Sequence, residues 1–118
     1  MSPERVDARI DRMAERLVWS VGGTVEQKEQ ISAIARSAAK DLRELRGQRG
    51  DLRRQAMELL KAPTIDRAAI EALRSQQMGV ADALSRRMSS ALADTAEVLT
   101  PEQRVKLAER MSHRGRRG

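Results

Sequence analysis

The sequence predicts an all-α protein, built as an elongated antiparallel helical hairpin with short flanking helices at both ends. Apolar residues recur at helical spacing along most of the chain, and a helix-capping phrase occurs near each end. The 118 residues include one Trp, no Phe and no Tyr, and 34% are charged. Because such a chain can bury only narrow apolar seams, we expect an intertwined or cradle-like homodimer.

The first flanking helix is expected over residues 3–18. Ser2 can cap its N-terminus, and Val6, Ile10, Met13 and Leu17 follow at spacings of four, three and four. The pair Gly22-Gly23 should end it.

The second helix is expected over residues 24–60, the first arm of the hairpin. Gly47 and Gly50 each cost about 1 kcal/mol inside a helix, so we expect a kink there. A seven-residue repeat of apolar residues runs along the helix if Arg49 occupies one position of the apolar face. Its members are Ile31, Ala35, Ala38, Leu42, Leu45, Leu52, Ala56 and Leu59.

The third helix is expected over residues 64–97, after a turn at Ala62-Pro63-Thr64. Pro63 disfavours helix at Ala62, and Thr64 can cap the next helix with Asp66 in its first turn. Each long helix would extend about 50 Å, and the short turn makes the two antiparallel neighbours. The apolar positions of this helix are Ile70, Leu73, Val80, Leu84, Met88, Ala91 and Val98.

A last helix is expected over residues 101–111, which completes a single helical domain covering residues 1–111. The basic segment 112–118 is polar and contains two glycines, so we expect it to be disordered.

Two short phrases carry the most information, Thr24-Val25-Glu26-Gln27 and Leu99-Thr100-Pro101-Glu102-Gln103. In each, the Thr hydroxyl can accept from a backbone N–H of the first turn, while the Gln three residues later bonds the backbone N–H of the Thr. Pro101 occupies the first helical position, where a missing N–H costs nothing. We interpret both as structural capping motifs.

The pair of phrases resembles the repeated Leu-Thr-x-x-Gln motif of the Spy/CpxP family, which includes the metal-responsive ZraP and CnrX relatives. The resemblance spans about residues 24–111, with Gly23 where the family has Leu. It implies an ATP-independent chaperone or envelope-stress protein in the periplasm, and a membrane-bound regulator as a further partner. Export would require a signal peptide or anchor that was trimmed from this chain, with Met1 added.

The chain does not have the residues of an enzyme site. It contains one His, no Cys, no Tyr and no Gly-rich phosphate loop. We therefore expect no catalysis and no cofactor, and the absence of an apolar run of about 20 residues predicts no transmembrane segment.

A periplasmic heavy-metal sensor or resistance regulator is the alternative that the resemblance leaves open. Imidazole is the ligand such sites need most, and the only candidates are Met111 and His113. One imidazole cannot close a tight site, so we expect no metal centre.

The net charge of +6 favours anionic partners. We expect unfolded or partly folded proteins to be captured by a basic helical strip with apolar edges, formed by Arg43, Arg46, Arg49, Arg53, Leu45 and Leu52. A third hypothesis is non-specific nucleic-acid binding through the Arg-rich surface. The lack of aromatic side chains that could stack on bases argues against it.

Overall fold

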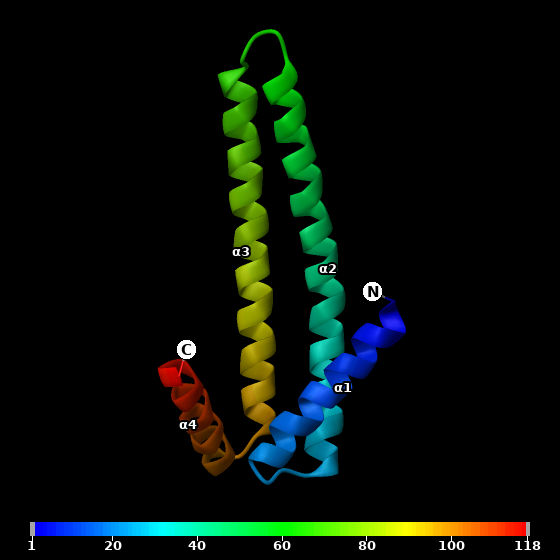
Figure 1. Cartoon of the computed structure of the whole chain (residues 1–118), viewed down its shortest axis with the longest axis vertical. Coiled ribbons are helices and arrows are strands. Elements are labelled where there is room, and N and C mark those ends of the chain that lie inside the picture. The colour runs from blue at the N-terminus through cyan, green and yellow to red at the C-terminus, as the bar shows by residue number, and fades with distance from the viewer. Residues whose placement is uncertain (1, 118) are drawn as a thin grey trace. The chain divides into compact units, whose positions relative to one another are not determined.

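The computed structural model describes residues 2–117, and within them it contains four helices and no strand (Figure 1). The helices are α1 (Pro3–Ser20), α2 (Val25–Lys61), α3 (Arg67–Val98) and α4 (Pro101–Arg117). The predicted all-α class is confirmed, and the ends of α1, α2 and α3 lie within three residues of the predicted ones.

The helices form two compact units. The first comprises Met1–Ser37 and Ser90–Gly118, and the second comprises Ala38–Ser89. Helices α2 and α3 therefore each contribute residues to both units.

In the first unit, α1 and α4 pack against the beginning of α2 and the end of α3. Leu17, Val98 and Leu107 border a small core whose buried members are Ala14, Val18, Val21, Ile31 and Leu99. An ion pair ties α1 to α2, because Arg36 Nη2 lies 2.5 Å from both carboxylate oxygens of Asp11. The apolar core and this ion pair together hold α1 in place.

The two glycines after α1 end the helix as predicted. Gly22 has φ +69°, a left-handed conformation that glycine adopts without strain. Its N–H donates to the Trp19 carbonyl at 3.2 Å, and the Gly23 N–H donates to the Val18 carbonyl at 2.8 Å. This is the hydrogen-bond pattern of a Schellman cap, and it satisfies the last carbonyls of the helix.

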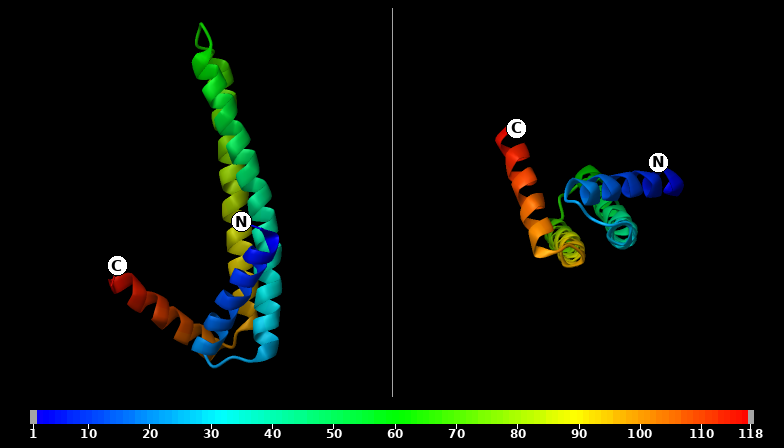
Figure 2. Two further views of the ribbon diagram at one scale, coloured as in Figure 1. Left: turned by 45° about the vertical axis from the view of Figure 1, so that its right-hand side comes forward. Right: turned by 90° about the horizontal axis from the view of Figure 1, so that it is seen from below.

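In the second unit, the α2 and α3 segments lie side by side and antiparallel (Figure 1, Figure 2). Near one end of the pair, Arg87 Nε donates to Asp41 Oδ2 at 2.7 Å. Near the other end, Leu59 of α2 and Ala69 of α3 line one cavity. The antiparallel hairpin is therefore confirmed, and the buried apolar residues of this unit are Ala38, Leu52 and Leu73.

Helix α3 begins at Arg67, and Asp66 rather than Thr64 is its N-cap. Asp66 Oδ1 accepts from the backbone N–H of Ala69 at 3.0 Å. The prediction of Thr64 as the cap was wrong, because the carboxylate of Asp66 both accepts this bond and interacts favourably with the positive end of the helix dipole.

Helix α2 continues as α-helix through Gly47 and Gly50, and the kink expected there stays a prediction. One feature of α3 differs from expectation. In α3, Ile70 and Met88 are 45% and 57% exposed, so they do not belong to the seam with α2.

Helix α4 also differs, because it continues to Arg117 and the predicted disorder of residues 112–117 was wrong. Arginine is a good helix former, and its charge is favourable near a helix C-terminus. Residue 118, the last residue of the predicted tail, lies outside the described residues.

Candidate functional site

The two capping phrases fold as reciprocal capping boxes. In the first, the Gln27 N–H donates to Thr24 Oγ1 at 3.1 Å, and the Thr24 N–H donates to Gln27 Oε1 at 2.9 Å. In the second, the Gln103 N–H donates to Thr100 Oγ1 at 3.2 Å, and the Thr100 N–H donates to Gln103 Oε1 at 2.9 Å. Pro101 is the first residue of α4. The predicted caps of α2 and α4 are therefore confirmed.

The two boxes are also bonded to each other inside the first unit. Gln27 Nε2 donates to Gln103 Oε1 at 2.8 Å, and Gln103 Nε2 donates to Gln27 Oε1 at 3.2 Å. Gln27 Nε2 also donates to the Val98 carbonyl at 3.1 Å. This amide pair joins residues 76 positions apart in sequence, and the spacing within each phrase gave no sign of it.

Gly23 explains how the first phrase departs from the second. A Cβ at this position would lie 2.5 Å from Val18 Cγ1 and 2.7 Å from Gln27 Oε1. Leu99, its counterpart before Thr100, is instead buried in the core. The first phrase therefore has glycine because the α1 cap and the amide pair leave no room for a side chain.

The predicted client-binding residues lie on the α2 part of the second unit. Arg43, Arg46, Arg49 and Arg53 are all exposed, and none has an ion pair among the described residues. The neighbouring Arg54, in contrast, pairs with Asp51. The four arginines therefore present charge that no carboxylate of the described chain neutralises.

The two apolar residues predicted to contact a client differ in burial. Leu45 is half-buried, whereas Leu52 is 7% exposed and lines a cavity between α2 and α3 with Val80 and Ala83. Leu52 therefore cannot contact a client, and its assignment was wrong. The seven-residue repeat that selected it marks the face of α2 that packs on α3.

Two further exposed apolar residues lie on the arginine face: Met57, one of the methionines expected to adapt to client surfaces, and Leu60, which the sequence analysis did not single out. Arg46, Arg49, Arg53, Met57 and Leu60 follow one another at spacings of three and four, so they share one face of α2. Met57 is 56% exposed and Leu60 is 70% exposed. We call these five residues the α2 strip. Extending the helical spacing beyond Arg53 would have found its apolar end.

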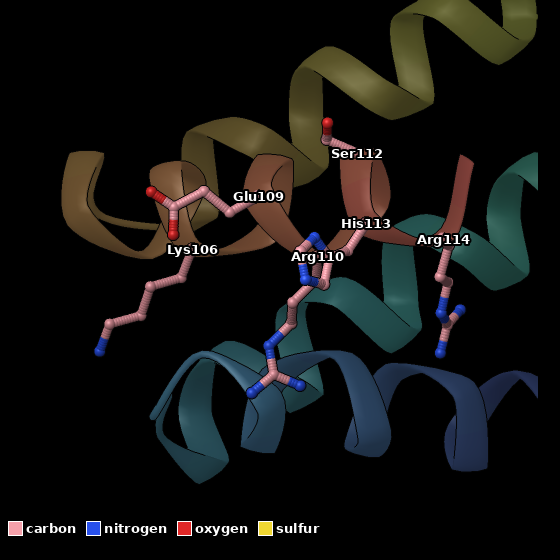
Figure 3. Close-up of a pocket in the computed structure, with 6 residues that line it drawn as sticks. All are labelled: Lys106, Glu109, Arg110, Ser112, His113 and Arg114. Atoms are coloured by element: carbon pink, nitrogen blue, oxygen red, sulfur yellow. The ribbon is translucent and has the colours of Figure 1, made fainter. Parts of the chain in front are cut away.

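The weak metal candidates do not come together. Met111 lines a groove shared with α1, whereas His113 lines a different pocket (Figure 3). That pocket holds one carboxylate, Glu109, against three basic side chains, so its net positive charge disfavours a cation. The described part of the chain has no group of three or more His, Cys, Asp or Glu side chains that could hold a metal ion.

Four helices that carry two paired Thr-x-x-Gln capping boxes define a class of helical protein with a duplicated motif. The chain belongs to the LTXXQ motif family, whose model matches residues 5–111. No curated protein and no solved structure matches the chain. None of the described helices is long and apolar enough to cross a membrane.

Proposed function

We propose that this protein is an ATP-independent periplasmic chaperone or envelope-stress protein that holds unfolded clients on the α2 strip. The observation that carries the proposal is the strip itself, in which three arginines without carboxylate partners among the described residues continue into exposed Met57 and Leu60. Membership of the LTXXQ family supports it, because that family includes the Spy/CpxP proteins. The work requires no covalent chemistry and no cofactor.

The mechanism has two steps with different physical origins. The arginines, with Arg43 beside them, attract acidic segments of a client over a distance set by ionic screening. Met57 and Leu60 then contact exposed apolar side chains, and the flexible thioether of Met57 adapts to irregular surfaces. Half-buried Leu45 borders the strip and contributes less contact area.

A homodimer is the second part of the proposal. Ile70 and Met88 are 18 residues and so about five turns apart, which puts both on one face of α3. That face is not part of the seam with α2, and burying it against a second copy would remove apolar surface from water. The dimer would also present two α2 strips to one client.

The metal-sensing and nucleic-acid alternatives have less support. The pocket of the single His113 has three basic side chains and one carboxylate, Glu109, and so favours no cation. The described chain has no aromatic side chain besides exposed Trp19 on which bases could stack.

The test is light scattering from a chemically unfolded model protein diluted into buffer with equimolar chain, without ATP or metal. The proposal expects suppressed aggregation that is lost when Arg43, Arg46, Arg49 and Arg53 are all changed to Glu. The matched control reverses four exposed arginines elsewhere, Arg5, Arg9, Arg12 and Arg67, and so has the same net charge. Equal protection by both variants contradicts the α2 strip.

A second pair of variants separates charge from apolar contact. The double variant Met57→Gln, Leu60→Gln should suppress aggregation less than the wild-type chain at every salt concentration, because apolar contact is lost. Raising the salt concentration should weaken only the attraction between the arginines and the client. Circular dichroism checks that each variant remains helical. If the wild-type chain does not suppress aggregation at all, the chaperone proposal is wrong.

A further inference from the structure

A second candidate site lies in the first unit, in a groove between α1 and α4 with a volume of about 430 Å³. Its eight lining residues are Met13, Arg16, Leu17, Ser20, Leu107, Arg110, Met111 and Arg114. The volume falls within the range of small-molecule pockets, roughly 300–1,000 Å³.

The groove is built from a repeated five-residue segment. Residues 13–17 read Met-Ala-Glu-Arg-Leu, and residues 107–111 read Leu-Ala-Glu-Arg-Met. The same positions of each copy line the groove: an apolar residue, then Arg three residues later, then a second apolar residue. Two equivalent helix faces therefore meet around one cavity.

The floor and walls of the groove are apolar. Leu17 and Leu107 pack on the core of the first unit and form a fixed floor. Met13 and Met111 are 58% and 63% exposed, and their flexible side chains can close over a ligand. The Ser20 hydroxyl offers no free donor, because it already donates to the Leu17 carbonyl at 2.6 Å.

Positive charge surrounds this apolar surface. Arg16, Arg110 and Arg114 line the groove, and no carboxylate does so. Figure 3 shows the side chains of Arg110 and Arg114 extending from α4 toward the side on which α1 lies. None of the three arginines has an ion pair within the described part of the chain.

We propose that this groove binds a single acyl chain with an anionic headgroup, a carboxylate or a phosphate. The acyl chain would lie on Leu17 and Leu107 between the two methionines, and the headgroup would be held by the guanidinium groups of the three arginines. This ligand matches both properties of the groove, the apolar floor and the uncompensated charge. The proposal is independent of client binding on the α2 strip.

Other occupants fit less well. A second copy of the same groove would bring six guanidinium groups together, which like-charge repulsion opposes. An extended peptide would find no partner for its backbone amides, because helices already bond their own backbone. The lining residues span eight residues of each helix, about 10 Å, which is too short to seat a helical peptide of several turns.

Isothermal titration calorimetry with decanoate tests the proposal, using the full chain and ligand concentrations below micelle formation. Decyl phosphate is the second anionic ligand and distinguishes the two headgroups, while decyltrimethylammonium carries the same alkyl chain with a positive charge. Both anionic ligands, or one of them, should bind with 1:1 stoichiometry per chain, and the cationic ligand should bind at least about tenfold more weakly. Equal binding of the cationic ligand, or no binding of either anion, overturns the proposal.

Substitutions in the lining test whether the ligand binds in this groove. Met13→Gln with Met111→Gln should weaken decanoate binding about tenfold, since apolar contact is lost. Met57→Gln with Met78→Gln is the matched control, because these methionines are 56% and 59% exposed and lie in the second unit.

A second pair of variants tests the charge. Arg110→Gln should weaken binding of the anions alone, and Arg67→Gln should leave it unchanged. If the control variants weaken binding as much as the groove variants do, the ligand binds elsewhere and the assignment is wrong. An acidic peptide that displaces decanoate with higher affinity would also contradict the choice of ligand.

Discussion

Gln27 and Gln103 each close a capping box and bond the other's side-chain amide. Replacing either glutamine leaves polar groups of the other without a partner in a half-buried place. The single change therefore lowers the free energy of unfolding by more than the contribution of one hydrogen bond. The two residues are therefore the most sensitive polar positions of the first unit.

We expect Gln103→Ala to lower the free energy of unfolding by about 2 kcal/mol and Thr100→Ala by about 1 kcal/mol. The double variant Gln27→Ala, Gln103→Ala should cost less than the sum of the single changes, by about 1 kcal/mol, because the second change removes the orphaned partner. Urea unfolding measures each value, and exposed Gln30→Ala is the control. Strict additivity would show that the amide pair contributes nothing.

At the scale of elements, the Asp11–Arg36 pair links α1 to α2. The hydrogen bond from Arg36 holds the pKa of Asp11 below its ordinary value of 3.8, and the charge of Arg36, the Ser32 hydroxyl and the charge of Lys28 act in the same direction. A lowered pKa in the folded state stabilises the fold fully above the unfolded value, and that contribution is lost as pH falls through the folded value.

Asp11→Asn should therefore lower the urea midpoint at pH 7, and the difference from wild type should shrink as the pH falls below about 4. Asp7→Asn removes the same charge from α1 and serves as the control, since Asp7 has no ion pair among the described residues. A difference that persisted undiminished at low pH would mean that the effect of Asp11 does not depend on its charge.

Gly47 and Gly50 are the other element-scale feature, because both interrupt a run of good helix formers in α2. A Cβ at Gly47 would meet nothing within 4 Å, and one at Gly50 would lie 3.9 Å from Arg54 Nη1. Alanine at either position should therefore stabilise the protein by about 1 kcal/mol, which thermal unfolding can measure. Gly23→Ala is the contrasting change and should destabilise, since its Cβ would overlap Val18. A destabilised Gly47→Ala variant would show that glycine is required there.

At the scale of the whole molecule, burial is sparse. Among the described residues, eight apolar side chains are buried: Ala14, Val18, Val21, Ile31, Ala38, Leu52, Leu73 and Leu99. A core of this size gives a monomer little stability, and association with a second copy would add to it by mass action.

The melting temperature should therefore rise with protein concentration, and sedimentation velocity should show a dimer at about 100 µM. Ile70→Gln with Met88→Gln should shift the equilibrium toward monomer, while Val105→Gln, a change of similar exposure on α4, should not. A concentration-independent melting temperature together with a monomer at every concentration would disprove the homodimer.

Much of the architecture was predictable from particular residues. The Thr and Gln of each capping phrase, the Gly22-Gly23 stop and the Pro63 turn act on backbone groups within about four residues, and helical spacing places Leu45, Leu52 and Leu59 on one face. Assigning the functional residues was harder, because spacing alone does not say whether an apolar face meets solvent or another helix. Leu52, expected to face a client, is buried against α3, whereas Leu60, which the spacing did not single out, is exposed.

The sequence by itself determined the helices, the capping boxes of α2 and α4 and the cationic face of α2, since these depend on local geometry and on charge that is present in any packing. Only the tertiary structure decided that Gln27 bonds Gln103, that Gly23 has no room for a side chain, and that α1 and α4 enclose a groove. Those features join residues up to 101 positions apart, from Met13 to Arg114. Contacts over such separations depend on how the helices pack, which no local rule specifies.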